Sequence, residues 1–331
     1  MLEKTLHAFA LLDALAAKGL DFIFKGGTSL LLRLPRIRRL SIDADILCGW
    51  PDAELDAVLA ELGHISPFTR MAEDDRGSHR LPSRRHLKFF YAPLDSRNPA
   101  PFVLLDVVKE GNLYPKVGAV PLRTSFVEGD GSLMVPTVEG LLGDKLTAFG
   151  PNTIGIPLND RYSMQFMKQV FDIGELFDAA SDLSEVRTAY ESIFAAENRY
   201  LGGRFTPEQA MTDAFSTAYC MTQVGLAGAP TDGRCELLEL GRRQLESHLV
   251  GSKFRREDMK TASSKAAFLT QALYSGLDLA SLRYNADRLG FLRTFVFSDE
   301  FAAIRRLKAI PEAMWYWSVA ARLQNGENLQ K

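Results

Sequence analysis

The sequence is poor in cysteine and has no cluster of residues with metal-ligand spacing. Its 331 residues include three cysteines, Cys48, Cys220 and Cys235, which are an odd number and lie far apart. They form no C-x-x-C pair, and the five histidines form no H-E-x-x-H motif. These absences argue against a disulfide framework and against a structural zinc site. Because free cysteines are usual in a reducing compartment, we expect a cytoplasmic protein.

Long apolar runs and an excess of one charge are missing as well. No stretch reaches the ~18 uncharged apolar residues that a membrane span requires, so no membrane partner is expected. The amphipathic pattern over residues 2–19 carries Glu3, Lys4, Asp13 and Lys18, which interrupts any signal-peptide core. Lys and Arg (39) nearly balance Asp and Glu (41), which excludes a polybasic protein but allows a local basic patch. With 46% hydrophobic residues, the composition is that of a globular protein.

Helical and strand patterns alternate in the first part of the chain. Apolar periodicity with glycine or proline stops predicts helices at residues 2–19, 28–34 and 51–63. Short apolar or alternating runs predict strands at residues 21–27, 38–49, 85–93 and 101–111. Between them, residues 66–85 are polar and rich in arginine, which is typical of an exposed loop, and residues 113–135 predict one more short strand.

The pattern changes about 135 residues into the chain. From Val138 onward nearly every segment has helical periodicity, and no repeat of fixed period is present. We therefore predict the α+β class, with a core of mixed sheet and helices in residues 1–135 followed by an all-helical domain in residues 136–331.

The segment from Phe22 to Ile46 holds the first candidate for a binding site. Gly26-Gly27-Thr28 lies between a predicted strand and a predicted helix, where backbone N–H groups at the helix start can hold a phosphate. Glycine permits a positive φ and a close approach of a ligand to the backbone. A Gly-Gly pair alone is more often a plain turn.

Three aspartates follow this turn. Asp43 and Asp45 are two residues apart on a predicted strand, so their carboxylates should share one face and repel each other unless a cation lies between them. Mg²⁺ prefers such oxygen ligands. Asp106 lies within the apolar strand V-L-L-D-V-V, and if that strand pairs beside the first, the three acids could hold two metal ions. A chance D-x-D and an edge ion pair are the plain alternatives, but the order of the three features favours a site.

These residues resemble the nucleotidyltransferase superfamily with the DNA polymerase beta-type core, whose mark is Gly-Ser/Thr followed by D-x-D. More narrowly, K-G-G-T-S-L at residues 25–30 and R-L-S-I-D-A-D at residues 39–45 are similar to the AbiEii/AbiGii toxin family, which includes the mycobacterial MenT toxins. A later K-x-x-A motif fits residues 145–148. The family's basic helix ending in Asp fits residues 168–172 in part, since Gln169 stands where many relatives have Asp. The resemblance covers roughly residues 20–180.

The resemblance implies an enzyme of the EC 2.7.7 type, dependent on Mg²⁺ or Mn²⁺, that moves a nucleotide from an NTP to an acceptor. In the MenT relatives the acceptor is the 3′ end of tRNA, and the family implies a toxin with a possible cognate antitoxin. It assigns metal binding to Asp43, Asp45 and Asp106, although Asp106 could instead help to deprotonate the acceptor hydroxyl. Lys145 would place a charge on the phosphates, with an ordinary solvated helix lysine as the alternative, and Asp172 would be a base or would orient Lys145. The nucleotide-binding residues would be Lys25, Gly26, Gly27, Thr28, Ser29, Arg39, Ser41 and Lys145.

Two basic runs could grip an RNA backbone without base specificity. The first comprises Arg33, Arg36, Arg38 and Arg39, and the second comprises Arg70, Arg76, Arg80, Arg84, Arg85 and Lys88. An ordinary charged surface is the alternative, and it is the favoured interpretation of the second run. His79 and His86 lie in the same region, with no spacing that suggests a catalytic pair.

Two further functions stay open from the sequence. One is a binding module that holds NTP or RNA without turnover and acts through a partner protein. The other is a nucleotidyltransferase whose acceptor is a small molecule or a protein side chain. A small acceptor would need a closed pocket, whereas RNA would need an open basic groove.

Overall fold

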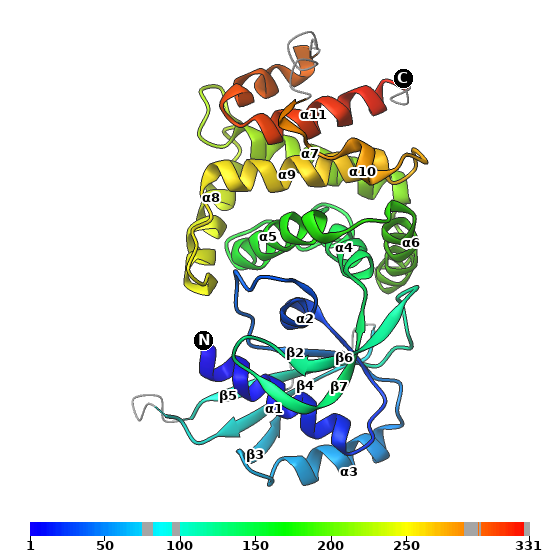
Figure 1. Cartoon of the computed structure of the whole chain (residues 1–331), viewed down its shortest axis with the longest axis vertical. Coiled ribbons are helices and arrows are strands. Elements are labelled where there is room, and N and C mark those ends of the chain that lie inside the picture. The colour runs from blue at the N-terminus through cyan, green and yellow to red at the C-terminus, as the bar shows by residue number, and fades with distance from the viewer. Residues whose placement is uncertain (75–81, 95–99, 288–296, 298, 328–331) are drawn as a thin grey trace. The chain divides into compact units, whose positions relative to one another are not determined.

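The computed structural model describes residues 1–74, 82–94, 100–287, 297 and 299–327. The chain divides into two compact units, Met1–Thr137 and Val138–Lys331. The first unit combines a sheet with helices, and the second is helical (Figure 1). The protein therefore has the α+β class that the sequence predicts.

The first unit is built on a mixed sheet of seven strands in the order β3-β4-β5-β2-β1-β7-β6. The centre of the sheet combines both strand directions, because β2 is antiparallel to β1 and parallel to β5, while β1 is parallel to β7. The strands are β1 (Ile23–Lys25), β2 (Ala44–Leu47), β3 (Phe68–Glu73), β4 (Arg84–Tyr91), β5 (Phe102–Val108), β6 (Val117–Arg123) and β7 (Glu128–Pro136).

One face of this sheet is closed by the apolar side of α1 (Leu2–Ala17), next to α3 (Asp52–Leu62). Phe9 of α1 meets Phe24 of β1 edge to face, with ring centroids 6.2 Å apart, and both side chains are fully buried. Alternate residues of the central strands belong to the same core cluster, including Ile46 and Leu105. Because strand side chains alternate between faces, the residues between them project from the opposite face.

Two segments contain more strand than the sequence predicts. The polar pattern of residues 66–85 predicts a loop, but β3 occupies Phe68–Glu73 and pairs with β4. Residues 113–135 hold two strands, β6 and β7, instead of one. Both β3 and β6 lie at the edges of the sheet and expose several of their side chains, so they lack the apolar alternation that marks a half-buried strand.

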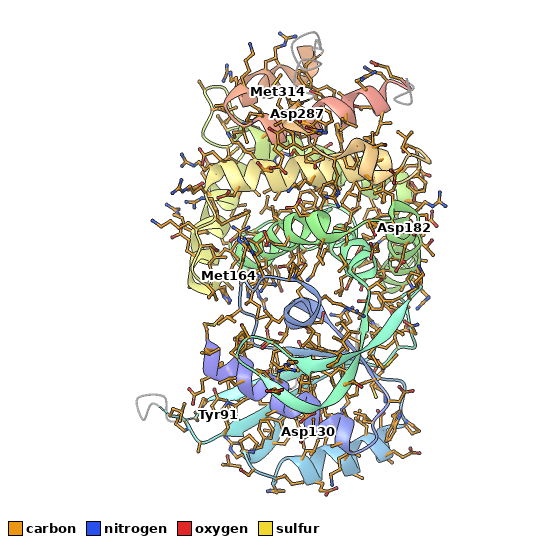
Figure 2. The ribbon with its side chains drawn as sticks, in the orientation of Figure 1. Tyr91, Asp130, Met164, Asp182, Asp287 and Met314 are labelled. Atoms are coloured by element: carbon orange, nitrogen blue, oxygen red, sulfur yellow. The ribbon has the colours of Figure 1, made fainter. Side chains whose placement is uncertain are left out.

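The second unit consists of α-helices and short 3₁₀ segments. Its described helices are α4 (Val138–Thr147), α5 (Ser163–Ala179), α6 (Leu183–Tyr200), α7 (Pro207–Gln223), α8 (Arg234–Leu245), α9 (Arg256–Ala272), α10 (Leu279–Leu282) and α11 (Pro311–Gln324), with 3₁₀ segments η1 (Glu246–His248) and η3 (Asp299–Ala309). Asp182, labelled in Figure 2, caps α6 by accepting hydrogen bonds from two of its first backbone N–H groups.

Helix α9 is the centre of the helical unit. It packs against α5, α7 and α11 and buries most of its residues. Its Lys265 is 4% exposed, and the ammonium group lies 2.7 Å from Asp178 and 2.9 Å from Glu312. Two acids around one buried cation satisfy the charge that this packing removes from water.

The structure also bears on the few cysteines and on the lack of long apolar runs in the sequence. Cys48, Cys220 and Cys235 are all buried free thiols. Over the residues that the structure describes, no helix has the length and apolar character to cross a membrane.

Candidate active site

Four polar side chains lie in register across the centre of the sheet. Lys25 of β1 pairs with Asp45 of β2, Asp45 pairs with Asp106 of β5, and Asp106 pairs with His86 of β4. Each of them has a strand neighbour in the core under α1, namely Phe24, Ile46, Leu105 and Leu87, so these four side chains share the opposite face. We call Lys25, Asp45, Asp106 and His86 the polar row. It places two carboxylates side by side, with a cation at one end and an imidazole at the other.

The glycine turn after β1 brings a helix against this row. Helix α2 (Gly26–Arg33) begins two residues earlier than the sequence predicts, directly after Lys25. Gly26 has a φ of +74°, and a Cβ atom there would lie 2.0 Å from Oδ2 of Asp45. Only glycine fits this conformation and this contact. The N-terminus of α2 therefore lies at the Asp45 carboxylate.

The segment before β2 packs on the first turn of α2. A Cβ atom at Gly27 would lie 2.6 Å from Nη2 of Arg39 and 3.1 Å from Oγ of Ser41. Both of these side chains are buried, and the hydroxyl of Thr5 donates a hydrogen bond to the carbonyl of Ser41 at 2.8 Å. The guanidinium of Arg39 thus lies beside the N-terminus of α2.

Asp43 is held by the same helix, but it is not on the strand. The strand predicted over residues 38–49 is shorter in the structure, since β2 begins at Ala44, so Asp43 directly precedes the strand that carries Asp45. The hydroxyl of Thr28 donates to the carbonyl oxygen of Asp43 at 2.6 Å, and the hydroxyl of Ser29 donates to that of Gly26 at 2.8 Å. Thr28 and Ser29 are fully buried, so both hydroxyls fix the backbone around the site.

His86 is the residue of the row that sequence reasoning missed. Its Nδ1 atom lies 2.5 Å from Oδ1 of Asp106, and both side chains are partly exposed. The two residues are 20 positions apart and meet only because β4 and β5 are antiparallel in this register. Spacing along the chain carries no signal for such a pair; the register of the predicted strands 85–93 and 101–111 would have been needed.

The donor set fits a divalent cation that shares its ligands with a substrate. Within the ranges that the structure describes, no three or more His, Cys, Asp and Glu side chains gather into a ready metal site, so the expected convergence of three acids is not found. Asp45 and Asp106 are nevertheless register partners on parallel strands. Mg²⁺ usually binds through one or two carboxylates together with substrate phosphates, and this acid pair meets that requirement.

The second unit holds a buried ion pair. Nζ of Lys145 on α4 lies 3.2 Å from Oδ2 of Asp172 on α5, and the side chains are 8% and 1% exposed. An isolated charge at such a depth would be costly, and the opposite charge of the partner offsets part of that cost. The two residues that the sequence singled out on separate helices are thus direct partners.

Comparison with known proteins identifies the family. The sequence profile described as "Nucleotidyl transferase AbiEii toxin, Type IV TA system" matches residues 10–265. The chain belongs to the AbiEii nucleotidyltransferase toxin family. No curated protein matches the sequence.

Three solved structures show distant likeness to this AbiEii family member. MenT4, a nucleotidyltransferase toxin from Mycobacterium tuberculosis H37Rv, is 16% identical, with 94% of this chain and 93% of that chain covered and a TM-score of 0.49. JHP933 from Helicobacter pylori is 14% identical, with 82% and 90% covered and a TM-score of 0.44. An antigenic nucleotidyltransferase-like protein from Paracoccidioides brasiliensis is 10% identical, with 60% and 88% covered and a TM-score of 0.38.

Two of the four arginines in the first basic run of this AbiEii protein, Arg33 and Arg39, make contacts within the fold. Arg33 donates from Nε to the carbonyl of Pro136 at 2.7 Å and also to that of Val135. Arg39 is buried beside Gly27. Arg36 is exposed and can meet a ligand.

The second basic run is partly neutralised by acids and an aromatic ring. Arg85 makes ion pairs with Glu73 and Asp56, and Lys88 makes one with Asp74 at 3.1 Å. The guanidinium of Arg70 lies 3.5 Å from the centroid of the Phe90 ring. These contacts favour an ordinary charged surface for this run. Arg76, Arg80 and His79 lie outside the described residues.

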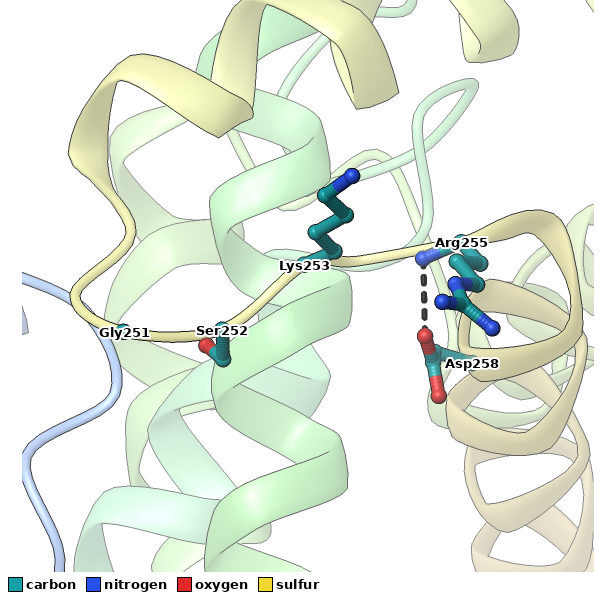
Figure 3. A pocket seen from close by; sticks show the side chains of 5 residues that line it. All are labelled: Gly251, Ser252, Lys253, Arg255 and Asp258. Carbon is teal, nitrogen blue, oxygen red and sulfur yellow. Dashed lines mark hydrogen bonds between the residues drawn. The ribbon is translucent and has the colours of Figure 1, made fainter.

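A separate hollow lies in the helical unit, just before α9. It has a volume of about 560 Å³, and its lining residues are Gly251, Ser252, Lys253, Arg255 and Asp258 (Figure 3). The backbone N–H of Arg255 donates to Asp258 at 2.7 Å, which caps the start of the helix. No sequence motif marks this pocket.

Proposed function

We propose that this AbiEii family member transfers a nucleotide from an NTP to an acceptor hydroxyl at the polar row. The observation that carries the proposal is the register of Asp45 with Asp106 beside the N-terminus of α2. A carboxylate pair suits divalent cations, and a glycine-started helix suits phosphates. Nucleotidyl transfer needs both, because a triphosphate must be held while charge develops on its α-phosphate and on the leaving pyrophosphate.

Asp45 and Asp106 would hold Mg²⁺ or Mn²⁺, with Asp43 beside them at the start of β2. When bound, the metal stabilises negative charge on the phosphoryl oxygens. The polar row also gives each acid a further neighbour, since Lys25 lies opposite Asp45 and His86 bonds to Asp106. Asp106 keeps its alternative role of drawing the proton from the acceptor hydroxyl.

The triphosphate would bind at the start of α2. The backbone N–H groups of Gly26 and Gly27 supply donors, and the cations of Lys25 and Arg39 supply charge. Ser41 lies beside Gly27 and can add a hydroxyl. The buried hydroxyls of Thr28 and Ser29 support this proposal indirectly, because they hold the backbone that presents the donors.

Lys145 and Asp172 are proposed to act together. The family resemblance assigns Lys145 to the phosphates, and the ion pair supports Asp172 as the group that orients it. A carboxylate that is 1% exposed and already paired is poorly placed to act as a base toward an external hydroxyl.

The acceptor is proposed to be RNA, most directly the 3′ end of tRNA, and the setting is proposed to be a cytoplasmic toxin–antitoxin system. Membership of the AbiEii family supports the toxin role and a partner antitoxin. The name of MenT4 describes it as a nucleotidyltransferase toxin, which agrees with this class. The exposed Arg36 can contribute to an RNA contact without base specificity.

Incubation of the purified protein with Mg²⁺, total tRNA and each α-labelled NTP in turn tests this proposal. We expect label on tRNA from one or two of the four nucleotides. Periodate oxidation of the tRNA 3′ diol should abolish the labelling if the terminal hydroxyl is the acceptor. Label on a protein or small molecule would replace RNA as the acceptor. Nucleotide binding without any labelled product would contradict the enzyme and favour the non-catalytic binding module.

A further inference from the structure

We propose that His86 is a positioning residue that orients the Asp106 carboxylate for a divalent cation. This inference rests on the proposed function, because it assigns the carboxylate pair to metal binding. It adds a residue that no sequence motif identifies. The inference follows from one contact, the hydrogen bond between Nδ1 of His86 and Oδ1 of Asp106.

The strand pairing makes this contact a fixed part of the sheet. His86 and Asp106 are register partners on β4 and β5, and Leu87 and Leu105, next to them along the strands, are fully buried. The backbone of both residues is therefore held by the core, and only the side-chain torsions stay adjustable. A hydrogen bond 2.5 Å long fixes those torsions for the acid.

Chemistry decides which atom carries the proton. An ionised carboxylate only accepts hydrogen bonds, so Nδ1 of His86 must donate. The bond engages Oδ1 of Asp106 and leaves Oδ2 as a cation ligand. Ligating carboxylates in metal sites are commonly held in this way, and loss of the supporting donor typically lowers metal affinity about 10- to 100-fold.

The charges around Asp106 explain why its carboxylate needs the hydrogen-bond donor of His86. Asp106 lies opposite Asp45, and two ionised carboxylates in neighbouring register positions repel each other. Without a donor, the Asp106 side chain would turn away from Asp45 whenever no cation is bound. On this face of β4, the cations two residues from His86 are Arg84 and Lys88, and Lys88 pairs with Asp74 at 3.1 Å. His86 is the residue of β4 whose side chain bonds to the second acid of the row.

Matched variants separate this role from simple packing. In His86→Asn the side-chain amide can place an N–H donor near the position of Nδ1, whereas His86→Leu keeps a similar bulk and removes the donor. Asp106→Asn tests the metal site itself. His64→Leu alters an exposed histidine of the same unit and serves as the control. Circular dichroism and thermal midpoints establish that each variant is folded.

Titration of each full-length variant with Mn²⁺, followed by electron paramagnetic resonance of the free ion, is the direct measurement. We expect His86→Leu to raise the Kd for Mn²⁺ about 10- to 100-fold, and His86→Asn to stay within about threefold of the native value. His64→Leu should bind as the native protein does. High Mn²⁺ should restore nucleotide transfer by His86→Leu but not by Asp106→Asn, because only the first variant keeps all its carboxylates.

Two sets of results would overturn the inference in distinguishable ways. If Asp106→Asn weakens Mn²⁺ binding while His86→Leu does not, the metal site stands and the role of His86 fails. The role of His86 fails as well if His86→Asn binds as weakly as His86→Leu, since the donor would then be irrelevant. The proposed metal site fails if neither Asp106→Asn nor His86→Leu changes Mn²⁺ binding, or if the native protein binds no Mn²⁺. The proposed role of His86 then fails as well, because it depends on that site.

Discussion

Gly26 has less room for a side chain than most other glycines in the part of the chain that the structure describes. It combines a φ of +74° with a carboxylate oxygen where a Cβ atom would lie. Gly19 has the same φ, but a Cβ atom there would have no atom within 4 Å. A substitution at Gly19 therefore measures the cost of backbone strain without the close contact that Gly26 makes.

We expect Gly19→Ala to lower the free energy of unfolding by about 1–2 kcal/mol through backbone strain alone. Gly26→Ala should cost more, because Asp45 must also move, and nucleotide transfer should be lost. Urea unfolding and the label-transfer assay check this pair. Equal stability losses, or an active Gly26→Ala, would contradict the close packing of Asp45 on the helix start.

Thr28 is a second single residue on which the site depends, because its hydroxyl donates one hydrogen bond to the backbone of Asp43. Thr28→Val keeps the shape of the side chain and removes the donor to the Asp43 carbonyl, which should lower the free energy of unfolding by about 1 kcal/mol. Transfer should fall as well, since the segment that carries Asp43 loses an anchor. Thr188→Val is the control, because that exposed hydroxyl bonds within its own helix, and it should change neither quantity measurably.

Among the elements, α4 and α5 are joined by the buried pair of Lys145 and Asp172. Asp172→Leu would leave the ammonium buried without its partner and should lower the free energy of unfolding by about 3–5 kcal/mol. The double variant Lys145→Met/Asp172→Leu should recover most of that loss, because no buried charge remains. Transfer should stay absent in the double variant if Lys145 acts on the nucleotide.

Urea unfolding of the two variants and of Arg123→Ala gives the comparison. The Arg123–Glu128 pair is 73% and 72% exposed, so breaking it should leave the midpoint unchanged. A double variant no more stable than Asp172→Leu would show that the pair contributes through packing alone, and recovered transfer would remove Lys145 from the mechanism.

Some helices and strands of the structure could be predicted from the sequence, and others could not. Helices α1 and α3 follow from apolar periodicity, and β4 and β5 follow from apolar runs between turn residues. Strand β3 does not, because an edge strand with exposed side chains lacks the pattern. Periodicity reports burial, so it predicts elements that face the core and misses those that do not.

Some residues of the candidate site could likewise be predicted from the sequence, and others could not. The glycine turn and Asp45 could be predicted because the motif is local, and Asp106 could be predicted because an acid inside an apolar strand stands out. The pairing of His86 with Asp106 depends on strand register, which the sequence does not specify at this distance. The strand predicted over residues 38–49 is longer than β2, because the alternating pattern extends beyond the hydrogen-bonded strand.

For the whole molecule, membership of the AbiEii family and the polar row lead to the same class of chemistry. The family profile spans residues 10–265, which include both the row in the first unit and the Lys145–Asp172 pair in the second. We propose that Asp45 and Asp106 act as a pair in metal-dependent nucleotide transfer.

The most direct test measures label transfer from an α-labelled NTP by the native protein, Asp45→Asn and Asp130→Asn under the same Mg²⁺ and acceptor conditions. Asp130 is an exposed aspartate on β7 outside the row (Figure 2). We expect Asp45→Asn to stay folded and to lose about 100-fold or more of the rate, because a ligand of the metal is gone. Asp130→Asn should transfer at the native rate. Native-like transfer by a folded Asp45→Asn would exclude Asp45 as a metal ligand needed for transfer.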